Sequence, residues 1–463
     1  MTDFILLDAR RLMYMNKLKT LLLSIALLLT GFNSANCASL SSTISKSEIN
    51  KMATVAVSVK DAKTGKVVYE YNEHKLMNPA SVQKIFTMYS AYNELGGDYT
   101  FKTGAYTDTN GNLYIKLGAD PSLTTAKLKM LLKSTAAKYK KPVKDIVIDP
   151  TIIDNKQWGI GWMWDDDTNP LLPKYSPFSI NENKIDITIT PSKNGRQPEI
   201  KNKSSYPMTI VNTLTNSNNT KLTFERQPWH SGDMTFIKGS VSSPVKVQLP
   251  VTSPERYFRA ELNSAIAQSG LKYSGVIKVA PTPKNAKELA VVSSEPLSKL
   301  VANTLKNSNN FYSEMIFKAA TAHAINGQGS TEKGIELFNN YFKDTDKENV
   351  LIVDACGISR NNLMSADWIT NSLNKIYSES NFEEFSQLMA KPVEGTLSDR
   401  LLNISLKLRA KTGTASGIST IAGYIDAQNG KKYSFAILIQ NYNMDTLEVK
   451  KFEDKLINEI YKM

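Results

Sequence analysis

The sequence contains few of the residues and motifs on which most hydrolases depend. Its 463 residues include only two cysteines and three histidines. The histidines do not form H-E-x-x-H and the cysteines do not form C-x-x-C, so neither common kind of zinc site is predicted. The chain also lacks G-x-S-x-G and G-x-x-x-x-G-K-[ST], which argues against an α/β-hydrolase and a nucleotide-driven enzyme. We therefore expect chemistry that needs no metal and no organic cofactor.

The charge of the chain does not indicate a nucleic-acid partner. Lysine and arginine number 56 against 44 aspartates and glutamates, which gives a net charge of +12. The lysines are spread along the sequence, without an Arg-rich block or a basic stripe interleaved with aromatic residues. We expect an ordinary solvated basic surface and no nucleic-acid binding.

Long apolar runs are also scarce, and the one at the N-terminus has the form of an export signal. Lys17 and Lys19 precede the apolar residues 21–32, and small residues follow. This run is too short for a bilayer, which needs about 20 apolar residues, and the pattern is typical of a signal peptide. We predict a signal peptide over residues 1–38, with residues 1–14 as a candidate start-site extension. A buried first helix is the alternative.

Cleavage after such a signal leaves Cys356 as the only cysteine, so the mature protein cannot form an internal disulfide. Cys37 raises the alternative of a lipoprotein, but Asn36 is a poor fit for the small residue that a lipidation site requires. No second candidate membrane span is present. We expect an exported, periplasmic protein that is soluble or at most peripherally associated with the membrane.

Three short motifs in one order carry the functional prediction. Ser81 and Lys84 form S-x-x-K, Ser308 and Asn310 form S-x-N, and Lys411 begins K-T-G. Each motif recurs elsewhere, because S-x-x-K occurs at four other serines, S-x-N at six others and K-T-G at two other lysines. Their order and local context are therefore what distinguish these copies from the others.

Local patterns place the motifs on a helix, a loop and a strand. An alternating pattern predicts a β-hairpin over residues 54–71, and a helix opens at Ser81. The stretch 104–284 reads as short strands and turns, so we predict an α/β domain from residues 39–103 and 285–463 that a β-rich insertion interrupts. The other predicted elements are strands at 112–117, 185–190, 208–211, 418–425 and 433–440, helices at 128–139, 297–305, 311–324 and 447–461, and a flexible loop at 213–220.

The first motif has the parts of an activated nucleophile. Ser81 and Lys84 are three residues apart at a helix start and so share one face. A lysine can take the proton of a serine hydroxyl if burial lowers its pKa, and a helix N-terminus favours the developing oxyanion. The alternative is a helix-start serine beside a solvated lysine.

The other two motifs contain groups that can move protons and bind substrate. Ser308 can relay a proton, and the Asn310 amide can both donate to and accept from a peptide. Lys411 and the threonines that follow lie along a predicted strand edge, where they can hold a carboxylate. The alternatives are a polar turn between helices and an ordinary turn.

Together these residues resemble the class C low-molecular-mass penicillin-binding proteins, the D-alanyl-D-alanine carboxypeptidase/endopeptidase family. The resemblance covers nearly the whole mature chain. It implies an α/β (α+β) fold of the penicillin-binding-protein and serine β-lactamase type, in which the insertion forms one or two extra domains. Beyond the three motifs, it rests on segments that begin at Asn78, Gly118, Gly161, Ser294, Gly357 and Glu394.

The resemblance also implies roles for individual residues. A D-Ala-D-Ala terminus of peptidoglycan would acylate Ser81, with Lys84 as base and with Ser308 and Lys411 as the relay to the departing D-alanine. The diaminopimelate side chain would bind Asp166 and Arg360, for which a loop aspartate and a surface arginine are the alternatives. The residues implied to position the peptide and its carboxylate are Asn310, Thr412, Gly413 and Thr414, and the backbone N–H groups of Ser81 and Thr414 would form the oxyanion hole.

Three departures from the family pattern stand out. The usual S-D-N is Ser308-Asn309-Asn310 here. Ala415 follows Thr414 at a position where family members often have a larger apolar side chain. The usual D-G-S-G becomes Asp354-Ala355-Cys356-Gly357, which puts a free thiol near the predicted cleft.

The sequence thus predicts a serine DD-peptidase that β-lactams inhibit covalently. A serine β-lactamase is one alternative, although no acidic residue is assignable as a deacylation base. A catalytically silent cell-wall-binding protein is the other.

Overall fold

A computed structural model describes residues 38–463, except 194 and 227–233. The predicted signal peptide therefore lies, but for its last residue, outside the described residues. Contact density divides the chain into two compact units. The first contains the N-terminal residues up to Met77 with 365–382 and 391–463, and the second contains 78–364 with 383–390. The domain limits drawn from the sequence remain a prediction.

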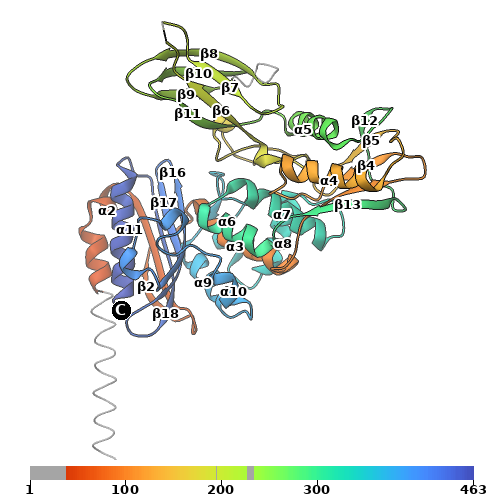
Figure 1. Cartoon of the computed structure of the whole chain (residues 1–463). Helices are drawn as coiled ribbons and strands as arrows, with labels where there is room; N and C mark the ends of the chain where they lie inside the picture. The colour runs from red at the N-terminus through yellow and green to blue at the C-terminus, as the bar shows by residue number, and fades with distance from the viewer. Residues whose placement is uncertain (1–37, 194, 227–233) are drawn as a thin grey trace, which may run out of the picture. The chain divides into compact units, whose positions relative to one another are not determined.

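The first unit is built on a five-stranded antiparallel sheet. The strand order is β16 (Leu408–Ala415), β17 (Ile418–Asp426), β18 (Lys432–Gln440), β1 (Thr54–Asp61) and β2 (Val67–Tyr71). Both faces of β17 and β18 are buried, because helices cover the sheet on both sides (Figure 1). These helices are α2 (Glu48–Met52) and α11 (Thr446–Tyr461) on one side and α9 (Ala366–Tyr377) on the other. The predicted hairpins at both ends of the chain are confirmed.

The second unit has a helical part in which α3 (Lys84–Leu95) packs against the helices around it. A short 3₁₀ helix, η1 (Ala80–Gln83), leads directly into α3. The neighbours of α3 are α6 (Leu297–Asn307), α7 (Asn310–Ala324) and α8 (Thr331–Tyr341), and the short elements α10 (Phe382–Ser386), β14 (Val350–Leu351) and β15 (Leu363–Met364) accompany them.

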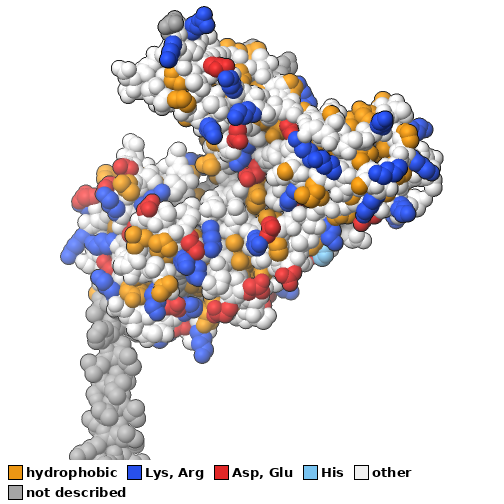
Figure 2. All heavy atoms as spheres, in the orientation of Figure 1, with side chains coloured by type: hydrophobic (Ala, Val, Ile, Leu, Met, Phe, Trp, Pro, Cys, Tyr) orange, Lys and Arg blue, Asp and Glu red, His pale blue; other side chains and the backbone are white. Residues whose placement is uncertain are grey.

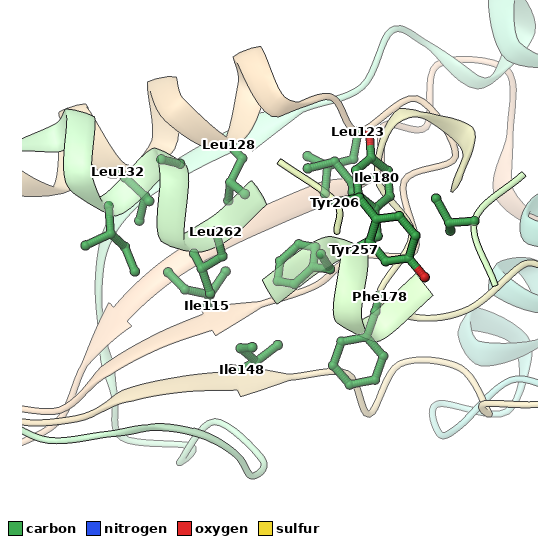
Figure 3. Close-up of a cluster of buried hydrophobic side chains, with 14 of the residues drawn as sticks. Ile115, Leu123, Leu128, Leu132, Ile148, Phe178, Ile180, Tyr206, Tyr257 and Leu262 are labelled. Atoms are coloured by element: carbon green, nitrogen blue, oxygen red, sulfur yellow. The ribbon is translucent and has the colours of Figure 1, made fainter. Parts of the chain in front are cut away.

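The rest of this unit contains three sheets and two helices around one apolar cluster (Figure 3). A mixed sheet has the order β12 (Ile277–Val279), β5 (Ile146–Asp149), β4 (Leu113–Lys116), β3 (Lys102–Thr107) and β13 (Lys287–Ser293). One small sheet has the order β8 (Thr209–Asn216), β10 (Met234–Val241) and β9 (Lys221–Glu225). The other has the order β11 (Val245–Pro250), β6 (Lys184–Thr190) and β7 (Glu199–Asn202). Helices α4 (Thr125–Lys138) and α5 (Pro254–Ser269) pack on each other, with Leu128 and Leu262 pointing into the cluster (Figure 3).

Two details of this region differ from the sequence-based prediction. The loop predicted at 213–220 is wrong at its start, because β8 continues to Asn216 and pairs in parallel with β10. Leu214 is buried there, and its burial outweighs the polar composition around it. Helix α5, which follows the cap residue Ser253, was not predicted from the sequence.

Basic side chains do not gather in a single stripe on the face drawn in Figure 2, where lysines and arginines are spread over the surface. Among the described residues, no helix combines the length and the apolar composition that crossing a membrane requires.

Candidate active site

The first motif forms a contact at the start of α3. Ser81 lies in η1 and Lys84 is the first residue of α3, so their side chains lie on the same side of the turn. The Lys84 Nζ atom lies 2.8 Å from the Ser81 Oγ atom. Lys84 is fully buried and Ser81 is 7% exposed, so little water reaches this pair.

The Lys84 amine has three acceptors, and all of them are uncharged. Besides Ser81 Oγ, it donates to Asn310 Oδ1 and to the carbonyl oxygen of Cys356, both at 2.6 Å. Burial lowers the pKa of Lys84, while nearby acidic groups act in the opposite direction. A neutral amine has two donors and one lone pair, so it can keep Asn310 and Cys356 as acceptors and take the proton of Ser81.

A second S-x-x-K in the same unit shows how much depends on burial. Ser330 precedes α8, as Ser81 precedes α3, and its Oγ caps the helix by accepting from the backbone of Lys333. The Lys333 amine, however, donates to the carbonyl of Gln328. This copy of the motif is an ordinary helix start.

The backbone before Ser81 is strained and closely packed. Ala80 has a left-handed φ of 45°, which is unfavourable for a residue with a side chain. The buried Asn78 holds the turn, because its Oδ1 accepts from Ala80 N at 3.0 Å and its Nδ2 donates to the carbonyl of Ser359 at 2.8 Å. A Cβ atom on Gly357 would lie 2.0 Å from the Ala80 carbonyl oxygen, so only glycine fits there.

The second motif occupies the turn between α6 and α7. Ser308 ends α6 in a left-handed conformation and Asn310 is the first residue of α7. Asn310 lies beside Lys84, and its Nδ2 donates to the carbonyl of Leu171 at 3.0 Å. The structure thus brings Ser81, Lys84 and Asn310 into contact.

The departure at Asn309 has a structural role. Its Oδ1 caps α7 by accepting from Tyr312 N, and its Nδ2 donates to Glu182 Oε2 at 3.2 Å. Glu182 lies in the middle of three consecutive left-handed residues, Asn181–Asn183, with φ between 50° and 54°. An aspartate, usual at position 309 in the family, has no hydrogen to donate to Glu182.

Beneath Lys84 lies a buried acidic cluster that the sequence did not reveal. Asp354 accepts from backbone or side-chain N–H groups of five residues, which stabilise its charge: Gln83, Trp162, Gly357, Ser359 and Asn362. Glu314 accepts from two backbone N–H groups of the same loop, and burial raises its pKa to about 7. Only the family-like Asp354 segment hinted at this cluster, while Glu314 carried no signal of its own.

This cluster also contains Cys356, whose thiol faces Asp354. Ligand atoms of Glu314, Asp354 and Cys356 lie within 4.8 Å of one another. We assign no metal to them, because Asp354 and one Glu314 oxygen already accept hydrogen bonds from N–H groups. Burial raises the pKa of the Cys356 thiol well above its usual value.

The segment around Trp162 lies against the same loop. The Trp162 indole donates to Asp354 at 2.8 Å, and a Cβ on Gly161 would meet the Ser359 hydroxyl. Asp166 follows in the 3₁₀ helix η2 (Trp164–Thr168). Burial raises the pKa of Asp166, and the charge of the exposed Arg360 partly offsets this. The two residues predicted to bind diaminopimelate are therefore electrostatic neighbours.

The third motif lies in the other unit, on the edge strand β16, as the sequence predicted. Lys411 is fully buried and donates to the carbonyl of Thr412 at 2.7 Å. Thr412 Oγ1 donates to the hydroxyl of Thr396 at 2.7 Å, Gly413 is buried and Thr414 is exposed.

Comparison with known proteins shows the family of the chain. The sequence profile of the D-Ala-D-Ala carboxypeptidase 3 (S13) family matches residues 37–460. The chain belongs to this family. The family confirms the predicted class of enzyme, a serine-type D-Ala-D-Ala carboxypeptidase.

Individual relatives match along most of their length. The D-alanyl-D-alanine carboxypeptidase DacB of Haemophilus influenzae is 24% identical over 96% of this chain and 98% of its own length. The penicillin-sensitive carboxypeptidase A of Dictyostelium discoideum is 26% identical over 84% of this chain and 83% of its own. The crystal structure of penicillin-binding protein 4 from H. influenzae covers 92% of this chain and 100% of its own with a TM-score of 0.80 at 24% identity, which confirms the predicted fold class.

Proposed function

We propose that Ser81 is the nucleophile of a periplasmic DD-peptidase that removes terminal D-alanine from peptidoglycan stem peptides. The observation that carries this proposal is the fully buried Lys84 amine, 2.8 Å from Ser81 Oγ and bonded only to uncharged acceptors. Burial lowers the pKa of this amine, so it can act as a base. The S13 family membership supports the substrate class.

The reaction proceeds in two steps. Lys84 takes the proton of the Ser81 hydroxyl as Oγ attacks the carbonyl of the penultimate D-alanine, and backbone N–H groups of Ser81 and Thr414 stabilise the oxyanion. The C–N bond then breaks, and the proton that Lys84 took passes through Ser308 and Lys411 to the departing amine, which leaves the Lys84 amine neutral again. Water, with Lys84 again as base, hydrolyses the acyl-Ser81 ester and regenerates the serine.

Substrate recognition uses groups from several segments. Asn310 orients the peptide beside Lys84, because its Nδ2 donates one hydrogen to Leu171 and has a second for a substrate carbonyl. Asp166 and Arg360 form a complementary pair for the amino and carboxyl groups of diaminopimelate, so we propose that the enzyme also cuts D-alanyl–diaminopimelate cross-links. The residues proposed to hold the terminal carboxylate are Thr412, Gly413 and Thr414.

Intact-protein mass after incubation with benzylpenicillin tests this function. We expect one long-lived penicilloyl adduct on the wild type and none on Ser81→Ala. Ser330→Ala is the matched control, because Ser330 begins the second S-x-x-K helix and should leave the adduct unchanged. Rapid return to the unmodified mass with loss of the drug would instead indicate a β-lactamase. A folded protein that neither forms an adduct nor consumes the drug would indicate a wall-binding protein.

A further inference from the structure

Glu314 lies directly under the catalytic lysine. It follows Asn310 by four residues on α7, so both side chains lie on the face of this helix that meets Lys84. Its side chain is fully buried. Glu314 Oε1 accepts two hydrogen bonds, from Ala355 N at 2.8 Å and from Cys356 N at 2.9 Å.

These two bonds fix the backbone just before the carbonyl that faces Lys84. The carbonyl of Ala355 has other partners: it accepts from Thr87 at 2.7 Å and from Ser313 at 3.1 Å. The carbonyl of Cys356 is then left to accept from Lys84 Nζ at 2.6 Å. One of the three acceptors of the lysine therefore depends on Glu314.

The second oxygen of Glu314 is buried without a hydrogen-bond partner. Within the described part of the chain, no cation forms an ion pair with this carboxylate. Lys318, one turn along α7, binds Asp154 Oδ1 at 2.5 Å and the carbonyl of Lys156 at 2.8 Å. The other titratable groups that face Glu314 are Asp354 and Cys356 on the loop, the phenol of Tyr175, and Lys84 on α3.

We propose that Glu314 is a positioning residue for the acylation of Ser81. Its carboxylate holds the backbone N–H groups of Ala355 and Cys356 so that the Cys356 carbonyl faces Lys84, and its charge sets the pH range in which Lys84 accepts the serine proton. The inference rests on the proposed function. Glu314 exchanges no proton with the substrate; it acts only through the peptide that it binds and through its field.

The direction of the charge effect follows from the geometry. A nearby negative charge stabilises the protonated lysine, so its removal makes Lys84 a weaker base that loses its proton at lower pH. Because burial brings the pKa of Glu314 to about 7, its charge acts on Lys84 above that pH. Neutralising Glu314 should therefore move the acidic limb of the acylation profile to lower pH.

Glu314→Gln separates the two parts of the proposal, because an amide oxygen can still accept both N–H groups but carries no charge. Glu314→Met removes both. For each variant we would measure the acylation rate with benzylpenicillin against pH by intact mass, with kcat and KM for a D-Ala-D-Ala peptide. Glu453→Gln is the matched control, since Glu453 is equally buried but lies in the other unit and pairs with Arg400.

We expect Glu314→Gln to keep the plateau rate within about threefold and to move the acidic limb down by about one pH unit. Glu314→Met, with a native circular dichroism spectrum, should lose about 100-fold in rate at every pH, and Glu453→Gln should keep the wild-type midpoint. Superimposable profiles of Glu314→Gln and the wild type, or a wild-type rate in Glu314→Met, would overturn the inference while leaving Ser81 acylation intact. A wild type that forms no adduct would overturn the proposed function as well.

Discussion

Among the buried lysines, Lys84 differs in what it contacts. Lys60 bonds to the carboxylate of Asp367, and Lys318 bonds to that of Asp154. The Lys84 amine has no carboxylate partner among the described residues and donates only to neutral oxygens. An ion pair would hold a lysine protonated, so this difference makes Lys84 a better base than Lys60 or Lys318.

Glu314 should make the folded protein less stable as the pH rises. Its pKa is about 7 in the folded state against 4.5 as the ordinary value, so between these two values the folded protein keeps a proton that the unfolded chain has lost. Stability falls as the pH rises through this interval, by up to about 3 kcal/mol. Denaturant unfolding across this range should show that the unfolding free energy of Glu314→Gln increases relative to that of the wild type as the pH rises. A constant difference would contradict the assignment.

Cys356 should be inert despite its place beside Lys84. Its thiol is fully buried, and burial with nearby negative charge keeps it protonated. In a Cys37→Ser background, a thiol-specific disulfide reagent should leave the native protein unmodified and react fully in guanidinium. Fast modification of the native protein at neutral pH would show that the loop around Cys356 opens.

At the scale of elements, the S-x-N turn is tied to a strained turn of the β-rich region. Residues Asn181–Asn183 are all left-handed, a conformation that asparagine tolerates better than most residues. The Asn181 amide donates to Thr125 and Tyr257, and the Asn183 amide donates to Lys174 and Ser179. These bonds hold the turn so that Glu182 reaches Asn309 at the start of α7.

Asn309→Asp should therefore weaken the contact between these two turns. The new carboxylate can still cap α7, but it faces Glu182 without a hydrogen to share. We expect a loss of about 1 kcal/mol in unfolding free energy and slower acylation, and Glu182→Gln in the same chain should restore most of both. A double-mutant cycle on stability and acylation rate measures this coupling. Additive effects of the two substitutions would show that the contact contributes neither to stability nor to the acylation rate.

At the scale of the whole molecule, local pattern was enough for the elements that carry the motifs. Alternation predicted the strands that became β1, β2, β17 and β18, and the spacing of Ser81 and Lys84 predicted their contact. Glu314 was not predicted, because one glutamate within a helix looks like any other until its surroundings are known. The continuation of β8 was missed for the same reason, since its parallel partner β10 lies about twenty residues further along the chain.

The strand pairing of the five-stranded antiparallel sheet of the first unit should govern the order of folding. β3 and β4 are joined by a short turn, whereas β1 pairs with β18, so that Thr54 lies opposite Gln440. Contacts between distant residues form late, because closing a long loop costs more entropy. Pulse-labelling hydrogen exchange during refolding should show the β3–β4 hairpin protected before the β1 amides that bond to β18, and these amides together with β18. Protection of these β1 amides before β18 would contradict this order.

This sheet has a consequence for how the protein is made. A chain that is synthesised from its N-terminus presents β1 and β2 long before β18 exists, so the apolar hairpin has an unpaired edge for most of that time. Such an edge is a template for aggregation and a target for proteases. We therefore expect a nascent chain to need chaperone protection until its last strands arrive, and a nonsense mutation before Lys432 removes the partner of the first strand.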